Sequence, residues 1–450
     1  MTRALPALAA LSLCILLSAL GTSIANVALP AVAATFGVSI QQVQWIVLAY
    51  LLSITTLIVS VGRLADLAGR RRMLLAGIAL FVVASIACGL APTLGALIAA
   101  RAVQGLGAAA MMALAMPFVA DTVAKEKSGS AMGLLGTTSA VGTALGPSLG
   151  GVLIAQLGWR AVFLAPVPLA LLAGVLAWRT LPADRAVASQ RERFDAAGTL
   201  LLAVTLASYA LAMSGRTSLF LAAFAGLALF IRVEAKAESP LLRLELFADR
   251  ARSAAFATNA LVTTVVMATL VVGPFYLADA LALDAARIGL VLSAGPVVAA
   301  LAGVPSGAMV DRFGTRRTTI AALGIMMTGC AVLSQMPPRF GIPGYLAPLV
   351  TITAGYALFQ AANNTAVMAD VPGDRRGVVS GMLNLSRNLG LITGASLMAA
   401  IFGAAGMRVT FAVAAGMAGL ALGVAYWENG RIRQDVGRSV QRFPRVRALS

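Results

Sequence analysis

The stretch Gly62–Leu74, GRLADLAGRRRML, gathers one aspartate and four arginines into a short segment, and it follows a long stretch without charge. Residues 4–61 carry no charged side chain at all. A helix that crosses a bilayer needs about 20 apolar residues. Residues 4–61 therefore predict two membrane spans joined near Gly37, and the charged stretch predicts a turn outside the membrane at the end of the second span.

The rest of the chain repeats this alternation. Hydrophobic residues make up 60% of it and charged residues only 11%, which is far from a soluble composition. The apolar runs are too long and too continuous for the strands of a barrel, so we expect an all-α integral membrane protein. About fourteen spans are expected, near residues 6–28, 43–61, 73–91, 96–120, 130–155, 160–178, 196–214, 218–233, 253–278, 287–308, 318–335, 344–368, 377–404 and 408–427.

The N-terminal run has a second interpretation. Residues 1–26 resemble a secretory signal, because Arg3 precedes an apolar stretch and small residues follow it. The apolar stretch is longer than a signal peptide uses, and a second span follows directly. We therefore expect the first span to remain in the protein.

The basic residues predict the orientation in the membrane. Arginine and lysine gather in alternate loops, and such loops stay in the cytoplasm, so both termini are expected there. This distribution accounts for most of the net charge of +17. A nucleic-acid partner is the alternative explanation of so basic a chain, but the charges are spread over many loops and form no single face. The loops in question hold Arg63, Arg70, Arg71, Arg72, Lys125, Lys127, Arg179, Arg185, Arg191, Arg193, Arg232, Lys236, Arg243, Arg250, Arg252, Arg312, Arg316, Arg317, Arg375 and Arg376.

The composition also excludes several kinds of chemistry. The chain has no histidine, which removes Ser-His-Asp and Cys-His catalysis and histidine-ligated metals. Its three cysteines, Cys14, Cys88 and Cys330, fall within expected spans and show no CxxC spacing. No GxxxxGK[ST] loop is present to bind a nucleotide. We therefore expect neither an enzyme nor a bound metal, cofactor or nucleotide.

The charged stretch has a second copy further along the chain. GxxxDxxGxRR occurs at Gly62–Arg72 and again at Gly307–Arg317, and a weaker similarity relates the segments that begin at Ala120 and Ala369. Both members of each pair lie on the same expected side of the membrane. The halves are therefore expected to be parallel repeats, related by an axis along the membrane normal.

The repeated motif suggests a charge latch between helices. Its glycines allow a sharp turn or a close approach of backbones, and its aspartate can pair with an arginine or with the positive end of a neighbouring helix. Such a pair can hold one conformation and release in another. The alternative is a loop that only sets topology and contains an incidental aspartate. The candidate latch residues are Gly62, Asp66, Gly69, Arg70, Arg71, Asp311, Arg312 and Arg316.

These motifs resemble those of the major facilitator superfamily, and most closely its fourteen-span drug/proton antiporters. GRLADLAGRRR resembles the loop between the family's second and third helices, RAVQGLGAAA its fourth helix and GTALGPSLGG its fifth. WRAVF at Trp159, FDAAGTLLLA at Phe194 and SPLLRLELF at Ser239 resemble fourteen-span members. The resemblance implies a six-helix bundle at 1–182, a linker with two additional helices at 183–250, a second six-helix bundle at 251–428 and a basic cytoplasmic tail at 429–450.

The resemblance also implies roles for two helices. In the expected fourth helix, the family associates the motif of Arg101 and Gln104 with proton coupling. In the expected fifth helix, the antiporter motif comprises Gly142, Gly146, Pro147, Gly150 and Gly151. Glycines every four residues form a smooth strip that allows close helix contact, and the proline can bend the helix. Ordinary packing of small residues is the alternative.

Two positions within the expected spans bear on the transport mechanism: Gly21, which lacks a charge, and Arg387, which carries one. The family's drug exporters have an aspartate in the first helix where this chain has Gly21, which leaves the proton-binding group unidentified and argues against cationic substrates. Arg387 lies well inside an expected span, where it is a candidate to bind an anionic substrate group or to form a gate. The alternative for Arg387 is hydrogen bonding to neighbouring carbonyl groups.

Polar and aromatic side chains within the spans are candidates to line a central substrate cavity. We expect a minority of them to meet the substrate and the others to join helices by hydrogen bonds. The candidates are Asn26, Tyr50, Asn259, Tyr276, Tyr356, Gln360, Asn363, Asn364 and Asn384.

The sequence thus predicts a secondary transporter that exports hydrophobic or amphipathic small molecules by alternating access. The resemblance implies proton antiport, with the proton gradient as the energy source, in a bacterial inner membrane. The alternative is an uptake carrier or facilitator for an anionic metabolite without proton coupling. The expected partners are the small-molecule substrate and the lipid bilayer, and the chain is expected to act as a monomer.

Overall fold

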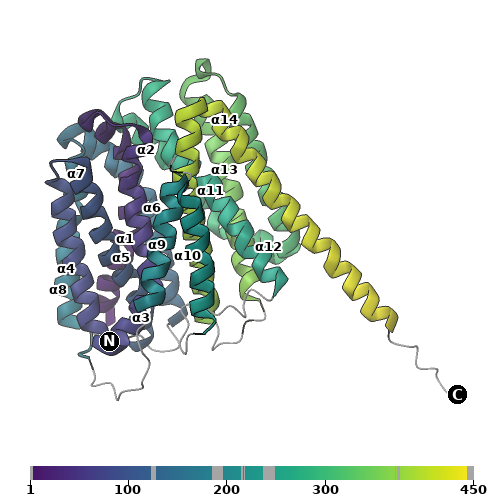
Figure 1. The fold of residues 1–450 in the computed structure, drawn as a ribbon, viewed down its shortest axis with the longest axis horizontal. Helices are drawn as coiled ribbons and strands as arrows, with labels where there is room; N and C mark the ends of the chain where they lie inside the picture. The colour runs from purple at the N-terminus through teal and green to yellow at the C-terminus, as the bar shows by residue number, and fades with distance from the viewer. Residues whose placement is uncertain are drawn as a thin grey trace.

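The computed structural model describes residues 4–122, 128–184, 196–213, 216, 218–236, 249–369, 371 and 376–442. All regular secondary structure in these ranges is helical, as Figure 1 shows. Nine helices in these ranges are long and apolar enough to cross a membrane. The expectation of an all-α membrane protein is confirmed.

The helices fall into three groups along the chain. The first half contains α1 (Ala4–Phe36), α2 (Ile40–Val43), α3 (Trp45–Ala68), α4 (Arg70–Gly89), α5 (Leu94–Thr122), α6 (Ser128–Leu157), α7 (Arg160–Leu164) and α8 (Pro166–Thr180). An additional pair follows, α9 (Ala196–Met213) and α10 (Leu219–Glu234). The second half contains α11 (Arg250–Asp279), α12 (Ala285–Gln335), the 3-10 turn Pro338–Phe340, α13 (Gly341–Met368) and α14 (Arg376–Arg442).

The two longest helices are each two spans joined at a glycine. Gly314 in α12 has φ 80° and Gly406 in α14 has φ 73°, a backbone region that favours glycine. The hydroxyl of Thr318 donates to the carbonyl of Met309 at 3.4 Å, nine residues earlier, a contact that a straight helix does not allow. Breaks at these glycines restore the separate spans that the sequence predicts at 287–308 and 318–335, and at 377–404 and 408–427.

Two helix ends differ most from the sequence prediction. The helix expected at 6–28 continues to Phe36, because Pro30 removes only one backbone donor and the packed helix tolerates it. The last helix, expected to stop at residue 427, continues to Arg442. The charges after residue 427 end a membrane span, but arginine and glutamine are good helix formers and do not end the helix.

Each half has its own hydrophobic core. In the first half, α1, α3, α4, α5 and α8 contribute to one cluster, which includes Leu11, Phe81 and Met111. In the second half, α11, α12, α13 and α14 contribute to another, which includes Met326 and Phe359. The additional helix α9 contacts both halves. Ser60 Oγ of α3 lies 2.7 Å from Thr199 Oγ1 of α9, and Tyr209 Oη of α9 lies 2.9 Å from Thr393 Oγ1 of α14.

The two ends of the molecule can be told apart by their turns. We call the end with the turns at Gly69 and Gly314 the basic end, and the opposite end, with the α1–α2 turn at Gly37, the far end; in Figure 1 the far end is at the top. A third core cluster joins the halves and includes Ile24 of α1, Val271 of α11 and Ala395 of α14. All three lie in the far half of their helices, so the two halves are packed together there.

Candidate functional site

Arg101 of α5 is the largest charged side chain buried in the described structure, with 1% of its surface exposed. Its guanidinium donates to three acceptors from three helices: the Ile46 carbonyl at 3.0 Å, the Gly21 carbonyl at 3.0 Å and Gln104 Oε1 at 2.5 Å. The guanidinium carbon also lies 4.1 Å from the centre of the Tyr50 ring, in a cation–π contact. Arg101 therefore joins α1, α3 and α5 through one charged group.

The partners of Arg101 are themselves held in place. Gln104 donates through Nε2 to Ser85 Oγ of α4 at 2.6 Å. Tyr50 donates through its hydroxyl to the Ser18 carbonyl at 2.9 Å and is fully buried. The network extends over four helices of the first half. Tyr50, which the sequence suggested as a substrate contact, lies inside this network and has no exposed surface in this conformation.

No carboxylate of the described residues forms an ion pair with Arg101. The position where the resemblance implies a carboxylate is Gly21, whose carbonyl accepts from Arg101. A Cβ atom at Gly21 would lie 2.8 Å from Tyr50 Oη, so a larger residue would displace the tyrosine. The buried positive charge is therefore balanced by carbonyl dipoles and an aromatic ring.

Three polar candidates of the second half, Gln360, Tyr356 and Asn259, form side-chain hydrogen bonds. Gln360 of α13 donates to Tyr356 Oη at 2.8 Å, and its Oε1 is buried and accepts no hydrogen bond from a described residue. Asn259 of α11 donates to Ser386 Oγ at 2.8 Å and to the Leu383 carbonyl at 3.2 Å, and so ties α11 to α14. Asn259 acts here as a link between helices.

The other cavity candidates are spread over the structure. Tyr276 stacks on Tyr345 with 5.9 Å between ring centres. Asn26 is buried and donates to the Thr22 carbonyl of its own helix. Asn364, Asn384 and Arg387 are exposed, and Asn363 is buried near the basic end. The described structure does not gather the candidates into one site, and their role in substrate binding stays a prediction.

The glycines of α6 contact two different neighbours. A Cβ atom at Gly142 would lie 2.6 Å from the Leu16 carbonyl, and one at Gly150 would lie 3.0 Å from Ile24, so this face packs on α1. Gly146 packs on α1 as well, against Ser23. The adjacent Gly151 turns to the second half, where its Cβ atom would lie 2.6 Å from the Ala285 carbonyl.

The contact of α6 with α12 joins the halves at backbone distance. A Cβ atom at Gly289 of α12 would overlap the Pro147 carbonyl and lie 2.8 Å from the Cα atom of Gly151. We call this contact the glycine seam. Sequence reasoning missed Gly289, because an isolated glycine in an apolar run carries no signal of its partner. Near the far end, Gln41 of α2 similarly lies against Gly403 of α14.

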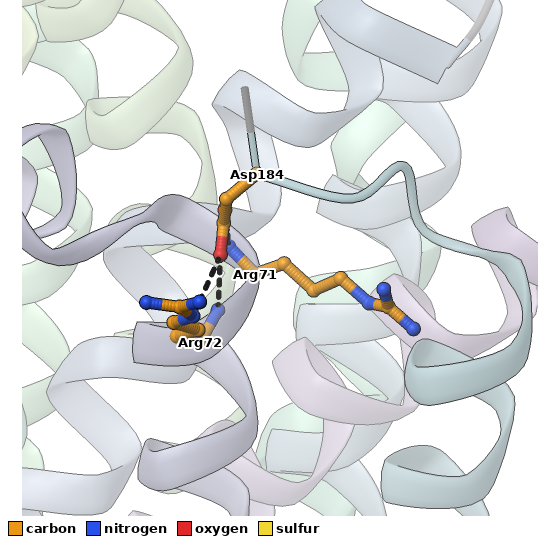
Figure 2. Close-up of polar contacts among 3 residues, drawn as sticks. All are labelled: Arg71, Arg72 and Asp184. Carbon is orange, nitrogen blue, oxygen red and sulfur yellow. Dashed lines mark hydrogen bonds and ion pairs between the residues drawn. The ribbon is translucent and has the colours of Figure 1, made fainter. Parts of the chain in front are cut away.

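The first copy of the charged motif is held by a residue that sequence reasoning missed. Asp184, which follows α8, accepts hydrogen bonds from the backbone N–H groups of Arg71 at 2.8 Å and Arg72 at 3.1 Å, as Figure 2 shows. These are the second and third residues of α4, the positions that an N-cap side chain serves. Gly69, the N-cap itself, has φ 98°, and a Cβ atom there would overlap the Asp184 carboxylate.

The remaining latch candidates are less connected. The Arg71 side chain reaches the carbonyl of Trp178 in α8. Gly62 and Asp66 lie within α3, but their surroundings are outside the described residues. Asp311, Arg312 and Arg316 of the second copy are exposed, and none forms an ion pair with a described residue. A latch at Asp66 therefore stays a prediction.

Replacement of Asp184 by alanine is expected to lower the free energy of unfolding by about 1 kcal/mol, because two N–H groups at the start of α4 lose their acceptor. Asn at this position keeps one acceptor oxygen and should cost less. The melting temperature of the purified protein in detergent measures the effect. Asp311→Ala is the matched control, since the Asp311 side chain is exposed; equal shifts for the two alanine variants would contradict the capping role.

Comparison with known proteins identifies the fold and its relatives. The model of the Major Facilitator Superfamily matches residues 11–392 and 253–444. The multidrug resistance protein Stp of Mycobacterium tuberculosis is 33% identical over 393 residues, covering 85% of this chain and 72% of Stp. The riboflavin transporter RibZ of Clostridioides difficile is 29% identical over 396 residues, covering 86% of each chain. The drug efflux pump JefA of M. tuberculosis is 31% identical over 402 residues, covering 85% of this chain and 77% of JefA.

Solved structures share the fold at low sequence identity. A bacterial homologue of the human lysosomal transporter Spinster superposes with a TM-score of 0.72 at 16% identity, covering 94% of this chain and 96% of the other. The xylose transporter XylE of Escherichia coli superposes with a TM-score of 0.66 at 14% identity, covering 94% and 97%.

Proposed function

The chain belongs to the Major Facilitator Superfamily, and from this premise we propose that it exports hydrophobic or amphipathic small molecules by proton antiport. It is a multi-pass membrane transporter and not an enzyme. The observation that carries the proposal is the identity of 33% with the multidrug resistance protein Stp over 85% of the chain. The additional pair α9 and α10, packed against both halves, supports placing it among the fourteen-span drug/proton antiporters.

The proposed mechanism is alternating access. The halves have separate cores and meet in the far half of the molecule, where the glycine seam brings backbones together without interlocking side chains. A contact of this kind can separate and re-form as two rigid bodies rock. The basic end would face the cytoplasm of a bacterial cell under the positive-inside rule. In that orientation, the conformation described here is closed toward the outside.

A second candidate function is an uptake carrier or facilitator for an anionic metabolite, without proton coupling. The buried charge of Arg101, which has no carboxylate partner among the described residues, favours this function. The relative named as a riboflavin transporter supports a metabolite as the substrate. Gly21 in place of a carboxylate also argues for neutral or anionic substrates over cations.

Reconstitution into liposomes tests the two functions. The fluorescent probes are ethidium as a cation, riboflavin as a neutral molecule and carboxyfluorescein as an anion. We expect an imposed pH gradient to drive at least one probe against its concentration gradient, with riboflavin or carboxyfluorescein moved faster than ethidium. Nigericin, which collapses the pH gradient, should stop the movement. Probes that only equilibrate, at a rate that nigericin does not change, would contradict antiport and support the facilitator.

A further inference from the structure

A cavity of about 300 Å³ lies inside the second half at the basic end. It is open to solvent on one side and lined by the first turns of α11, the turn of α12 after Gly314, the last turns of α13 and Ala425 of α14. The side chains that give it chemical character are Asp249, Arg252, Thr258, Arg316, Thr319 and Asn363. The cavity is separate from the Arg101 network, which belongs to the first half.

The cavity presents hydrogen-bond donors that have no acceptor in the described structure. Asn363 is 4% exposed, yet its Nδ2 is buried and donates to nothing in the described part of the chain. A buried donor without an acceptor is costly, at about 1–3 kcal/mol. Arg316 also lines the cavity and forms no ion pair with a described residue. The buried Nδ2 of Asn363 therefore lacks an acceptor among the described residues, and the exposed guanidinium of Arg316 adds a positive charge to the lining of the same cavity.

The acidic residue of the cavity is already engaged. Asp249 caps α11, with Oδ1 accepting from the backbone N–H of Ala251 at 3.0 Å, and its Oδ2 lies 3.2 Å from Nε of Arg252. The Asp249–Arg252 pair has no net charge. With Arg316 included, the charged side chains of the lining have a net charge of +1. The hydroxyl of Thr319 donates to the Thr315 carbonyl of its own helix. The lining is thus positive, and Arg316 and Asn363 supply its donors.

The first copy of the charged motif shows which group occupies the position that corresponds to Gly314. In the first copy of the motif, the carboxylate of Asp184 lies against Gly69 and accepts from the N–H groups of the following turn. In the second copy, Gly314 has a similar positive φ, but no described atom lies within 4 Å of the position of its Cβ. The helix that starts at Thr315 therefore presents its positive end to the cavity side, and no carboxylate of the described residues lies against Gly314 as Asp184 lies against Gly69.

The geometry points to a binding site for a phosphate-bearing anion in this cavity. Donors converge on it from α12 and α13, and a helix N-terminus adds partial positive charge, a combination that suits the several acceptor oxygens of a phosphate group. The phosphate can belong to a soluble phosphate or to the headgroup of an anionic lipid, because the basic end lies where headgroups meet water. In either case it would tie α12 to α13 as Asp184 ties α4 to the end of α8.

Binding to the purified full-length protein tests the site with two probes. Inorganic phosphate is titrated in lipid-free detergent and followed by the melting temperature. Phosphatidylglycerol is titrated and followed by native mass spectrometry. Arg316→Gln is expected to weaken binding of the effective probe about ten-fold, since it removes one charge-assisted hydrogen bond. The matched control is Arg317→Gln, an exposed neighbour outside the cavity lining, which should bind like the wild type.

A second variant separates binding from folding. Asn363→Leu removes a donor without an acceptor, so the melting temperature without probe should not fall, whereas the affinity for the probe should. Binding of phosphate that competes with the lipid indicates a soluble phosphate as one occupant. Binding of phosphatidylglycerol alone indicates a lipid headgroup. Equal affinities in the wild type and Arg316→Gln for both probes, or equal losses in Arg316→Gln and Arg317→Gln, would overturn the site.

Discussion

Replacement of Arg101 by alanine is expected to reduce probe transport by roughly 10- to 100-fold, because each charge-assisted hydrogen bond is worth about 1.5–3 kcal/mol and 1.4 kcal/mol corresponds to ten-fold. The variant removes a guanidinium that joins α1, α3 and α5, and it leaves Gln104 Oε1 without that donor. The measurement is the initial rate of probe movement in liposomes, per mole of reconstituted protein.

Two further variants show whether the loss of transport rate comes from the buried network. Arg101→Lys keeps the charge but cannot reach three acceptors with one planar group, so its rate should lie between those of alanine and the wild type. Arg408→Ala removes an exposed arginine whose bond to Gln335 lies near the far end, and it should transport like the wild type. If Arg101→Ala transports as fast as Arg408→Ala, the buried network has no part in transport.

Leucine in place of Gly289 is expected to have the second largest effect. Its side chain would meet the Pro147 carbonyl and the backbone of Gly151, atoms that cannot move unless α6 and α12 separate. Overpacking of this kind costs about 1–3 kcal/mol, enough to shift a two-state equilibrium by roughly ten-fold or more. We therefore expect the conformation closed at the far end to lose population and transport to slow by a similar factor.

Spin-label distances can report the shift directly. Labels at Ser39→Cys and Arg339→Cys sit on exposed positions at the far ends of the two halves. The distance between them should increase in Gly289→Leu. Gly303→Leu is the matched control on the same helix, where no described atom lies within 4 Å of the added Cβ. Identical distance distributions in the two variants would show that the glycine seam does not hold the halves together.

The positions of the spans were predictable because the bilayer acts on each segment separately. A run of apolar residues bounded by arginine, as at residues 4–61, has one stable arrangement in lipid, and the backbone must form helices there. The turns at Gly69 and Gly314 were predictable because charged residues beside each glycine place it outside the membrane and glycine allows a sharp turn. Both glycines have positive φ. The family followed from the same motifs, and the comparisons confirm it.

The contacts that make the candidate site were decided only by the tertiary structure. Asp184 meets Arg71 across 113 residues, and Arg101 meets the carbonyl of Gly21 across 80. The sequence singled out Gly151 but did not show that it faces Gly289 while Gly150 faces Ile24. In lipid, the face of a helix that touches protein is as apolar as the face that touches acyl chains. Hydrophobic patterning therefore sets where a helix lies in the chain, whereas the choice of its neighbour depends on shape and on a few buried polar groups that find their partners only when the helices assemble.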